Sequence, residues 1–284
     1  MSFAPASGRD ELEARLRSFG DRADAEIDVA EAALILAAFD RPGVSLSHYR
    51  QHLSRLARDT ADLGERHGAA TSLHGRVAAL NAVMLERYGY AGDRLTYDDI
   101  QNANLMRVID RRKGLPVALG ILYMHATRAQ GWPIEGLTFP GHCLLRLALG
   151  GERAILDPFN GGALRGPREL RELLGSVAGA GSELTPAHTT AVSNRDVLLR
   201  LQNNTKLRLL QERRPEAALG VLETMLMIAP DHGELWREAG GLHARLGNLR
   251  AAAIALEKSL KLVRDGPARQ QAAALLQKVK TRLN

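Results

Sequence analysis

The spacing of apolar residues predicts two helical regions with a short stretch of β-structure between them. In residues 9–90 apolar side chains recur at helical intervals. Asp28 stands where one of these helices needs an N-cap, and Pro42-Gly43 would end that helix. A strongly apolar helix is predicted from Leu115 to Gly131, and the chain from about residue 196 onward reads as helical again.

The stretch between these regions has the pattern of strands. Three short apolar runs follow the strongly apolar helix, at residues 134–139, 142–149 and 153–157. Gly150-Gly151 separates the last two runs, and two glycines between apolar runs are typical of a tight hairpin. We therefore predict an antiparallel sheet directly after a buried helix. Residues 160–195 are rich in Gly, Ser and Thr, and the stretch GSVAGAGSELTPAHTT at 175–190 is predicted to be a loop or an irregular linker.

The predicted hairpin brings a histidine and an aspartate together. With its centre near Gly150, His142 and Asp157 should be direct cross-strand neighbours. An aspartate in that position can accept a hydrogen bond from the imidazole and fix its tautomer.

Cys143, the only cysteine, directly follows His142. Successive side chains of a strand point to opposite faces, so Cys143 should face away from His142. We expect it to be a small buried hydrophobic residue, unless a bulge at Gly141-His142 turns it towards the histidine.

The start of the apolar helix is the other place where a thiol nucleophile would be expected, because a helix N-terminus stabilises a thiolate. Its first residues are Leu115, Pro116 and Val117. Proline is favourable there because the N–H that it lacks would have no partner. The sequence thus predicts a well-formed helix start without a nucleophile.

The C-terminal region contains an internal repeat. Similar residues recur 34 positions apart, which is the length of a tetratricopeptide unit; the pairs are Leu201 and Leu235, Ala217 and Ala251, Leu222 and Leu256, and Leu226 and Leu260. The second unit is the better match, with Trp236, Ala239-Gly240, and His243 where a tyrosine is usual. Residues 267–284 would form a final helix that covers the open end.

Composition and charge exclude several classes of function. The chain of 284 residues is 45% hydrophobic and carries a formal charge of +6, but its arginines alternate with acidic residues. Without a Lys/Arg block we expect no binding to nucleic acid or to membranes. A single cysteine, an N-terminus unlike a signal peptide and apolar runs too short to span a bilayer lead us to expect a cytoplasmic protein.

Metal and cofactor motifs are missing from the sequence. His48 and His52 are spaced for one helix face, but no acidic ligand accompanies them. The chain has neither an HExxH pattern nor a phosphate-binding glycine loop. We expect no metal and no cofactor.

Two stretches carry a resemblance to a known family. NANLMRVIDRRKGLPVALGILYMHATRAQGWPIEGLTFPGHCLLR and ILDPFNGG resemble the SirB-type branch of the transglutaminase-like family, which has a papain-like core. The resemblance covers about residues 25–265 and implies an α+β, mostly helical fold. Residues 1–90 would be a helical region forming one unit with a transglutaminase-like core at 91–190, which holds a buried helix and a small antiparallel sheet. Residues 191–284 would be two tetratricopeptide-like repeats and a capping helix.

The resemblance also assigns candidate site residues. His142 and Asp157 match two members of a Cys-His-Asp triad, and the cysteine position falls at or near Pro116. Residues matching the border of the cleft, where they would cap the helix or hold the loop, are Asn102, Asn104, Arg112, Gly114 and Pro116. Those expected in a groove of the repeats are Asn203, Lys206 and Trp236.

Two functions remain open at this point. The first is a protein that has lost the catalytic cysteine and uses its cleft and repeats to bind a protein or peptide partner. The second is an atypical hydrolase or acyltransferase, in which His142, oriented by Asp157, acts as a general base or Cys143 acts as a nucleophile. We favour the first, because the helix start offers no nucleophile.

Overall fold

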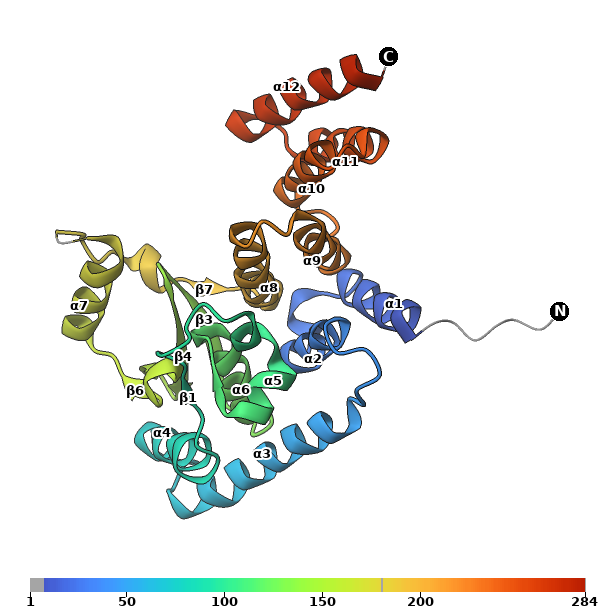
Figure 1. Cartoon of the computed structure of the whole chain (residues 1–284). Helices are drawn as coiled ribbons and strands as arrows, with labels where there is room; N and C mark the ends of the chain where they lie inside the picture. The colour runs from blue at the N-terminus through green and yellow to red at the C-terminus, as the bar shows by residue number, and fades with distance from the viewer. Residues whose placement is uncertain (1–7, 180, 284) are drawn as a thin grey trace. The chain divides into compact units, whose positions relative to one another are not determined.

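The computed structural model describes residues 8–179 and 181–283 (Figure 1). The described chain is α+β and mostly helical, as the sequence predicts. It divides into two compact units, one formed by Asp24–Leu201 and one by the described residues of Met1–Ala23 and Gln202–Asn284.

The unit Asp24–Leu201 contains a small sheet and helices. Its α-helices are α2 (Val29–Phe39), α3 (Ser47–Arg66), α4 (Leu73–Asn81), α5 (Leu105–Arg111), α6 (Pro116–Arg128), α7 (Pro167–Ala178) and the first part of α8 (Asn194–Gln211). A π-helix, η2 (Ala82–Arg87), continues α4, and short 3₁₀ turns are η1 (Asp24–Glu26), η3 (Ile100–Ala103), η4 (Pro158–Asn160) and η5 (Pro186–Thr189). Asp28 caps α2 as predicted, with its carboxylate accepting from Ala30 N and Glu31 N at 3.0 Å.

Five antiparallel strands form the sheet, in the order β6-β5-β4-β3-β7. Their bounds are β3 (Ile134–Phe139), β4 (His142–Leu149), β5 (Glu152–Asp157), β6 (Ala163–Leu164) and β7 (Ala191–Val192). The predicted hairpin joins β4 and β5, and Gly150 and Gly151 adopt the positive φ angles of 57° and 104° that its turn requires. A separate pair of two-residue strands, β1 (Ala91–Gly92) and β2 (Lys113–Gly114), runs parallel.

Two helices cover opposite faces of this sheet. The apolar helix α6 packs on the face to which Cys143 and Leu145 point. It comes close because Gly120 has no side chain: a Cβ there would lie 3.3 Å from Cys143 Sγ. On the other face Leu137 and Leu144 pack against Leu170 and Leu174 of α7, in a cluster that also includes Phe139.

The predicted irregular linker is wrong for residues 175–178, which are the last turn of α7, while its residue 180 lies outside the described residues. Charged residues stand between the leucines of α7, yet these leucines recur at helical spacing, and Leu170 and Leu174 are buried. Tertiary packing of one narrow apolar face therefore decides the structure here, despite the glycine and serine that follow.

The second unit consists of helices. They are α1 (Gly8–Gly20), the rest of α8, α9 (Pro215–Ile228), α10 (Gly233–Arg245), α11 (Leu249–Leu262) and α12 (Gly266–Leu283). Helices α10 and α11 form a tight antiparallel pair in which a Cβ on Gly240 would lie 2.5 Å from Leu256 Cγ. α12 packs on α11 through Ala272, Leu276 and Val279 and corresponds to the predicted final helix, whose residue 284 lies outside the described residues.

The units differ from the predicted domain scheme in two places. α1 was expected to join residues 1–90, but it belongs to the unit of the repeats, where it packs against α9. Leu16 and Phe19 supply its buried face. The expected boundary at residue 191 is also displaced, because α8 is a single helix and the units divide at Leu201.

Replacing Gly20 should destabilise the unit that holds the repeats. A Cβ at this position would lie 2.4 Å from the backbone oxygen of Met227 on α9. We expect Gly20→Ala to lower the free energy of unfolding by about 1–3 kcal/mol, as overpacking usually does. Urea titration followed by circular dichroism measures the change. Gly220→Ala, in the open middle of α9, is the control and should raise stability by about 0.5–1 kcal/mol; equal effects of the two substitutions would contradict the packing of α1 on α9.

Candidate functional site

His142 and Asp157 form a buried hydrogen bond at one end of the β4–β5 hairpin. Nε2 of His142 donates to Oδ1 of Asp157 at 2.8 Å, and the side chain of Asp157 is completely buried. The predicted contact is therefore present, although the predicted pairing is wrong. Leu145 lies opposite Leu156, which makes Asp157 a diagonal neighbour of His142.

The pairing differs because Gly150 and Gly151 both belong to the turn. Leu149 pairs with Glu152, so the centre of the hairpin lies between the two glycines. Diagonal neighbours share one face of a sheet and are within reach of long side chains, which explains why the hydrogen bond survives the different register.

Asp157 is the centre of a larger polar network. Its Oδ2 accepts from Arg165 Nε at 3.0 Å, Arg165 Nη2 at 2.6 Å and Asn160 Nδ2 at 2.7 Å. Oδ1 also accepts from the backbone N–H of Asn160, so Asp157 caps the turn η4. Burial alone would raise the pKa of Asp157, but the hydrogen bonds from His142, Asn160 and Arg165 outweigh it and lower the pKa to about 2.

Aromatic and basic side chains surround the histidine. The ring of Phe159 stands at 85° to that of His142, with 5.9 Å between centroids, and Tyr97 meets the other side of Phe159 at 5.8 Å. The guanidinium of Arg94 lies over Phe159 and donates to Asn160. Gly92 of β1 makes room for Phe159, since a Cβ there would lie 2.5 Å from the ring.

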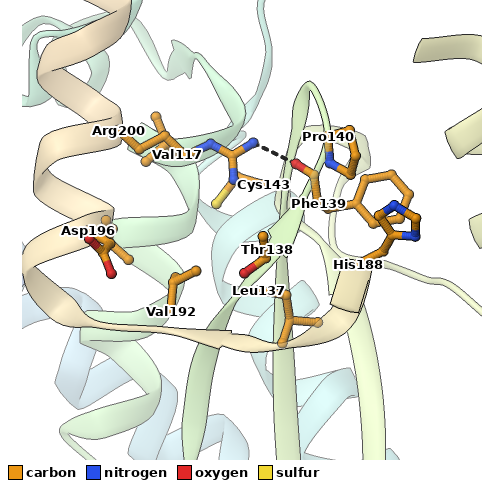
Figure 2. Close-up of a pocket in the computed structure, with 11 residues that line it drawn as sticks. Val117, Leu137, Thr138, Phe139, Pro140, Cys143, His188, Val192, Asp196 and Arg200 are labelled. Carbon is orange, nitrogen blue, oxygen red and sulfur yellow. Dashed lines mark hydrogen bonds between the residues drawn. The ribbon is translucent and has the colours of Figure 1, made fainter. Parts of the chain in front are cut away.

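Arg200 holds the turn that leads into His142. From α8 it donates to the carbonyl oxygen of Phe139 at 2.9 Å (Figure 2). It also donates to the carbonyl oxygen of His142. These two residues pair across the turn between β3 and β4, so one guanidinium fixes both ends of the turn. Nothing in the sequence pattern indicates this contact, because Arg200 is remote from Phe139 and His142 along the chain.

Cys143 lies on the opposite face of β4 from His142. The pairing of β3 with β4 continues without interruption through Cys143, which leaves no place for the bulge considered above. Its sulfur points into a cavity of about 340 Å³ that is also lined by Val117, Thr138 and Arg200 (Figure 2). The residue is only 4% exposed, and burial raises the pKa of its thiol to about 11.

The start of α6 is built as the sequence predicts. Pro116 occupies the first turn, and Leu115, in an extended conformation, is the N-cap without a side-chain hydrogen bond. The backbone N–H of Leu115 donates to the carbonyl oxygen of Asn102 at 2.9 Å.

Asn102 and Asn104 hold the loop before α6. The side chain of Asn102 donates to Thr96 O at 2.6 Å and accepts from Arg111 at 2.9 Å. Asn104 caps α5 by accepting from Arg107 N and donates to Ala37 O at 3.0 Å, which ties α5 to α2. Both asparagine side chains therefore serve to hold this loop and its neighbouring helices in place.

Arg112 contacts a cluster of its own. It ends α5 with a left-handed backbone (φ 59°), donates to Nε2 of His52 at 2.9 Å and lies over the ring of Tyr90. Burial and the charge of Arg112 lower the pKa of His52 to about 4, so its imidazole is neutral and can accept this hydrogen bond. Gly114 fits against Val108, whose methyl carbon would lie 2.8 Å from a Cβ. Among the described residues that were expected at the site, His142 and Asp157 are thus hydrogen-bonded to each other, whereas Arg112 belongs to a different cluster.

The residues expected in the repeat groove are separated. Lys206 on α8 is buried and paired with Glu238, while Asn203 is half-buried on the same helix. Trp236 on α10 donates its indole N–H to Pro230 O at 2.7 Å and lines a different groove, of about 560 Å³, with residues of α1, α9 and α11. Among the described residues, neither Asn203 nor Lys206 lines that groove.

The described residues hold neither a cluster of metal-binding side chains nor a membrane-spanning helix. Across 8–179 and 181–283, no three His, Cys, Asp or Glu side chains are grouped to hold a metal ion. None of the helices described is long and apolar enough to cross a bilayer.

Comparison with known proteins gives two domain matches and several relatives. A family model described as transglutaminase-like superfamily matches residues 47–203, and a tetratricopeptide repeat model matches residues 205–277. A UPF0162 protein of Vibrio cholerae is 32% identical over 221 residues, covering 78% of this chain and 80% of that protein. A UPF0162 protein of Pseudomonas aeruginosa is 31% identical over 245 residues, covering 84% and 86%. Protein SirB1 of Salmonella typhimurium is 28% identical over 168 residues, covering 59% and 62%.

The network around Asp157 should make stability depend on acid pH. Because its pKa is lower in the folded chain than in the unfolded one, Asp157 stabilises the fold above about pH 4, and this contribution is lost as the pH falls through about 2. The shift corresponds to about 2 kcal/mol. Urea titrations between pH 5 and pH 2 should therefore show a smaller acid loss for Asp157→Asn than for the unmodified chain. Asp62→Asn, at an exposed position of α3, should leave the loss unchanged.

Proposed function

The chain belongs to the transglutaminase-like superfamily through residues 47–203 and to the family of the UPF0162 proteins, and from that premise we propose that it is a non-catalytic member that binds a protein or peptide partner. The observation that carries the proposal is the separation of Cys143 from His142. A thiol and its base must lie within hydrogen-bond reach to act together. Here they occupy opposite faces of one regular strand, and Pro116 occupies the helix start where the resemblance places the cysteine.

The environment of the two candidate groups supports the same proposal. A buried thiol with a pKa of about 11 is protonated at neutral pH and is a poor nucleophile. The carboxylate of Asp157 accepts hydrogen bonds from His142, Asn160 and Arg165, and these bonds join β4, η4 and the segment before α7. The His142–Asp157 hydrogen bond is then a structural contact that keeps the end of the hairpin in place.

The repeats supply the binding half of the proposal. Tetratricopeptide repeats generally mediate protein–protein interaction, and a repeat model matches residues 205–277. A domain that keeps its fold without its nucleophile, next to such repeats, is suited to recognition.

One observation favours a second function. With Nε2–H donated to Asp157, Nδ1 of His142 carries a lone pair, and within the described residues it has no hydrogen-bond partner. Such a nitrogen can take a proton from water, which would make the chain a His-Asp hydrolase. Acid–base catalysis alone accelerates reactions by about 10²–10⁴-fold, so this function would need further groups from the substrate.

The reactivity of Cys143 tests the central observation. We expect iodoacetamide to modify the native chain very slowly at pH 8 and the urea-unfolded chain rapidly, because the buried thiol has a raised pKa. Mass spectrometry of the labelled chain measures both rates. Rapid labelling of the native chain, with a rate that reaches half its maximum below about pH 8.5, would instead show an activated, accessible thiol and would contradict the non-catalytic proposal.

Substituting His142 separates the two functions. For the binding role we expect His142→Ala to lower the free energy of unfolding by about 1–3 kcal/mol, since Asp157 loses a buried hydrogen bond. Urea titration is the measurement, and exposed His74→Ala is the matched control. The hydrolase would give the reverse pattern: turnover of p-nitrophenyl acetate that disappears in His142→Ala, with the urea midpoint nearly unchanged.

A further inference from the structure

We infer that a groove on the unit of the repeats docks a basic amphipathic helix of a partner protein. The groove has a volume of about 560 Å³, within the range of ordinary binding sites. It is lined by residues of α1, α9, α10 and α11, with Asp21 just after α1 and Pro230 between α9 and α10.

The shape of the groove suits a helix. Ala239, Ala251 and Ala255 contribute small side chains, so a helix can come close to the backbone of α10 and α11. Larger apolar residues of α9, α10 and α11 also line the groove. A helix binds such a surface through apolar anchors at i, i+3, i+4 and i+7.

Two of the lining residues carry the apolar argument. Ile254 is 67% exposed, so most of its side chain is available to a ligand in the groove. The indole N–H of Trp236 is already bonded to Pro230 O, so its ring offers an apolar surface that needs no further hydrogen bond.

Charge selects the kind of helix. Asp21 and Glu223 are exposed lining residues of the groove, and neither carboxylate forms an ion pair with any described residue. The one cationic side chain in the lining, Arg17, is paired with Glu13 at 2.9 Å. On a chain whose formal charge is +6, this local surface is acidic and complementary to lysine and arginine.

His243 adds a polar requirement inside the groove. Its Nδ1 is buried and has no hydrogen-bond partner among the described residues. Leaving a polar atom buried and unpaired costs about 1–3 kcal/mol. If the ring turned so that Nδ1 faced the groove, a hydroxyl, amide or ammonium group of a docked helix would satisfy it.

Among the residues described, this surface shares Trp236, but neither Asn203 nor Lys206, with the groove that the sequence predicts. In the described chain its lining contains no residue of α8, where Asn203 and Lys206 lie. It includes α1, which lies outside both matched family ranges. The inference rests on the proposed binding role and gives that role a location and a partner chemistry.

The test uses two synthetic helical peptides and the full chain. Both peptides have about 18 residues, so that they can form helices in water, and carry leucines at the four anchor spacings. One has about four lysines and the other about four glutamates on the face beside the leucines, with alanines elsewhere to keep both peptides helical. Isothermal titration calorimetry at low salt should show the lysine peptide binding at least about tenfold more tightly.

Four variants localise the binding. Glu223→Lys and Ile254→Ser, both at exposed positions of the groove, should each weaken binding of the lysine peptide by about tenfold. Their matched controls, exposed Glu65→Lys on α3 and exposed Leu95→Ser, should bind as the unmodified chain does. Circular dichroism verifies that all four are folded.

Three results would overturn the inference. The first is equal affinity for the two peptides, and the second is equal losses in groove variants and controls. The third is a dimer of the chain itself that Ile254→Ser dissociates, which would make a second copy the occupant. The His142→Ala chain should still bind the lysine peptide, because the described lining of the groove contains no part of the His142 site. Turnover that depends on His142 would therefore refute the non-catalytic role but leave the docking inference standing.

Discussion

The close approach of α6 to β4 is the contact on which the core of the unit Asp24–Leu201 depends. Gly120 permits it, because a Cβ at that position would lie only 3.3 Å from the sulfur of Cys143, closer than Cβ contacts normally are. Once Cys143 is directed at the helix, the alternation of a regular strand directs His142 to the other face, and α7 closes that face over Leu144. The same packing that makes the core compact therefore separates the thiol from the imidazole.

Asp157 is the second organising point, and it is electrostatic. A fully buried carboxylate is tolerated because its lone pairs are occupied by His142, Asn160 and Arg165. Arg200 fixes the turn before His142 by donating hydrogen bonds to the carbonyl oxygens at its two ends. The histidine is thus fixed at its side chain by one network and at its backbone by another, and a side chain held in this way is suited to a structural task at the end of a hairpin.

Local pattern predicts most of this fold, and long-range contacts account for what it misses. The hairpin follows from Gly150-Gly151, the cap from Asp28 and the helix start from Pro116, all of which act on their neighbours in the sequence. His142 and Asp157 are diagonal and not direct neighbours because both Gly150 and Gly151 belong to the turn. The sequence of side chains alone does not fix which residues form the turn. The packing of α1 on α9 and the hydrogen bonds of Arg200 join residues that are remote in sequence, so a local pattern does not reveal them. α7 was missed because its buried leucines are few and stand among charged residues.

The position of the single cysteine also has a practical consequence. A native chain whose one thiol is packed against a helix behaves in water as though it contained no cysteine at all. A pair of cysteines introduced at surface positions of one unit would then be the targets for maleimide dyes or nitroxides. The distance between the two labels could be measured by spectroscopy without first removing a residue on which the core depends.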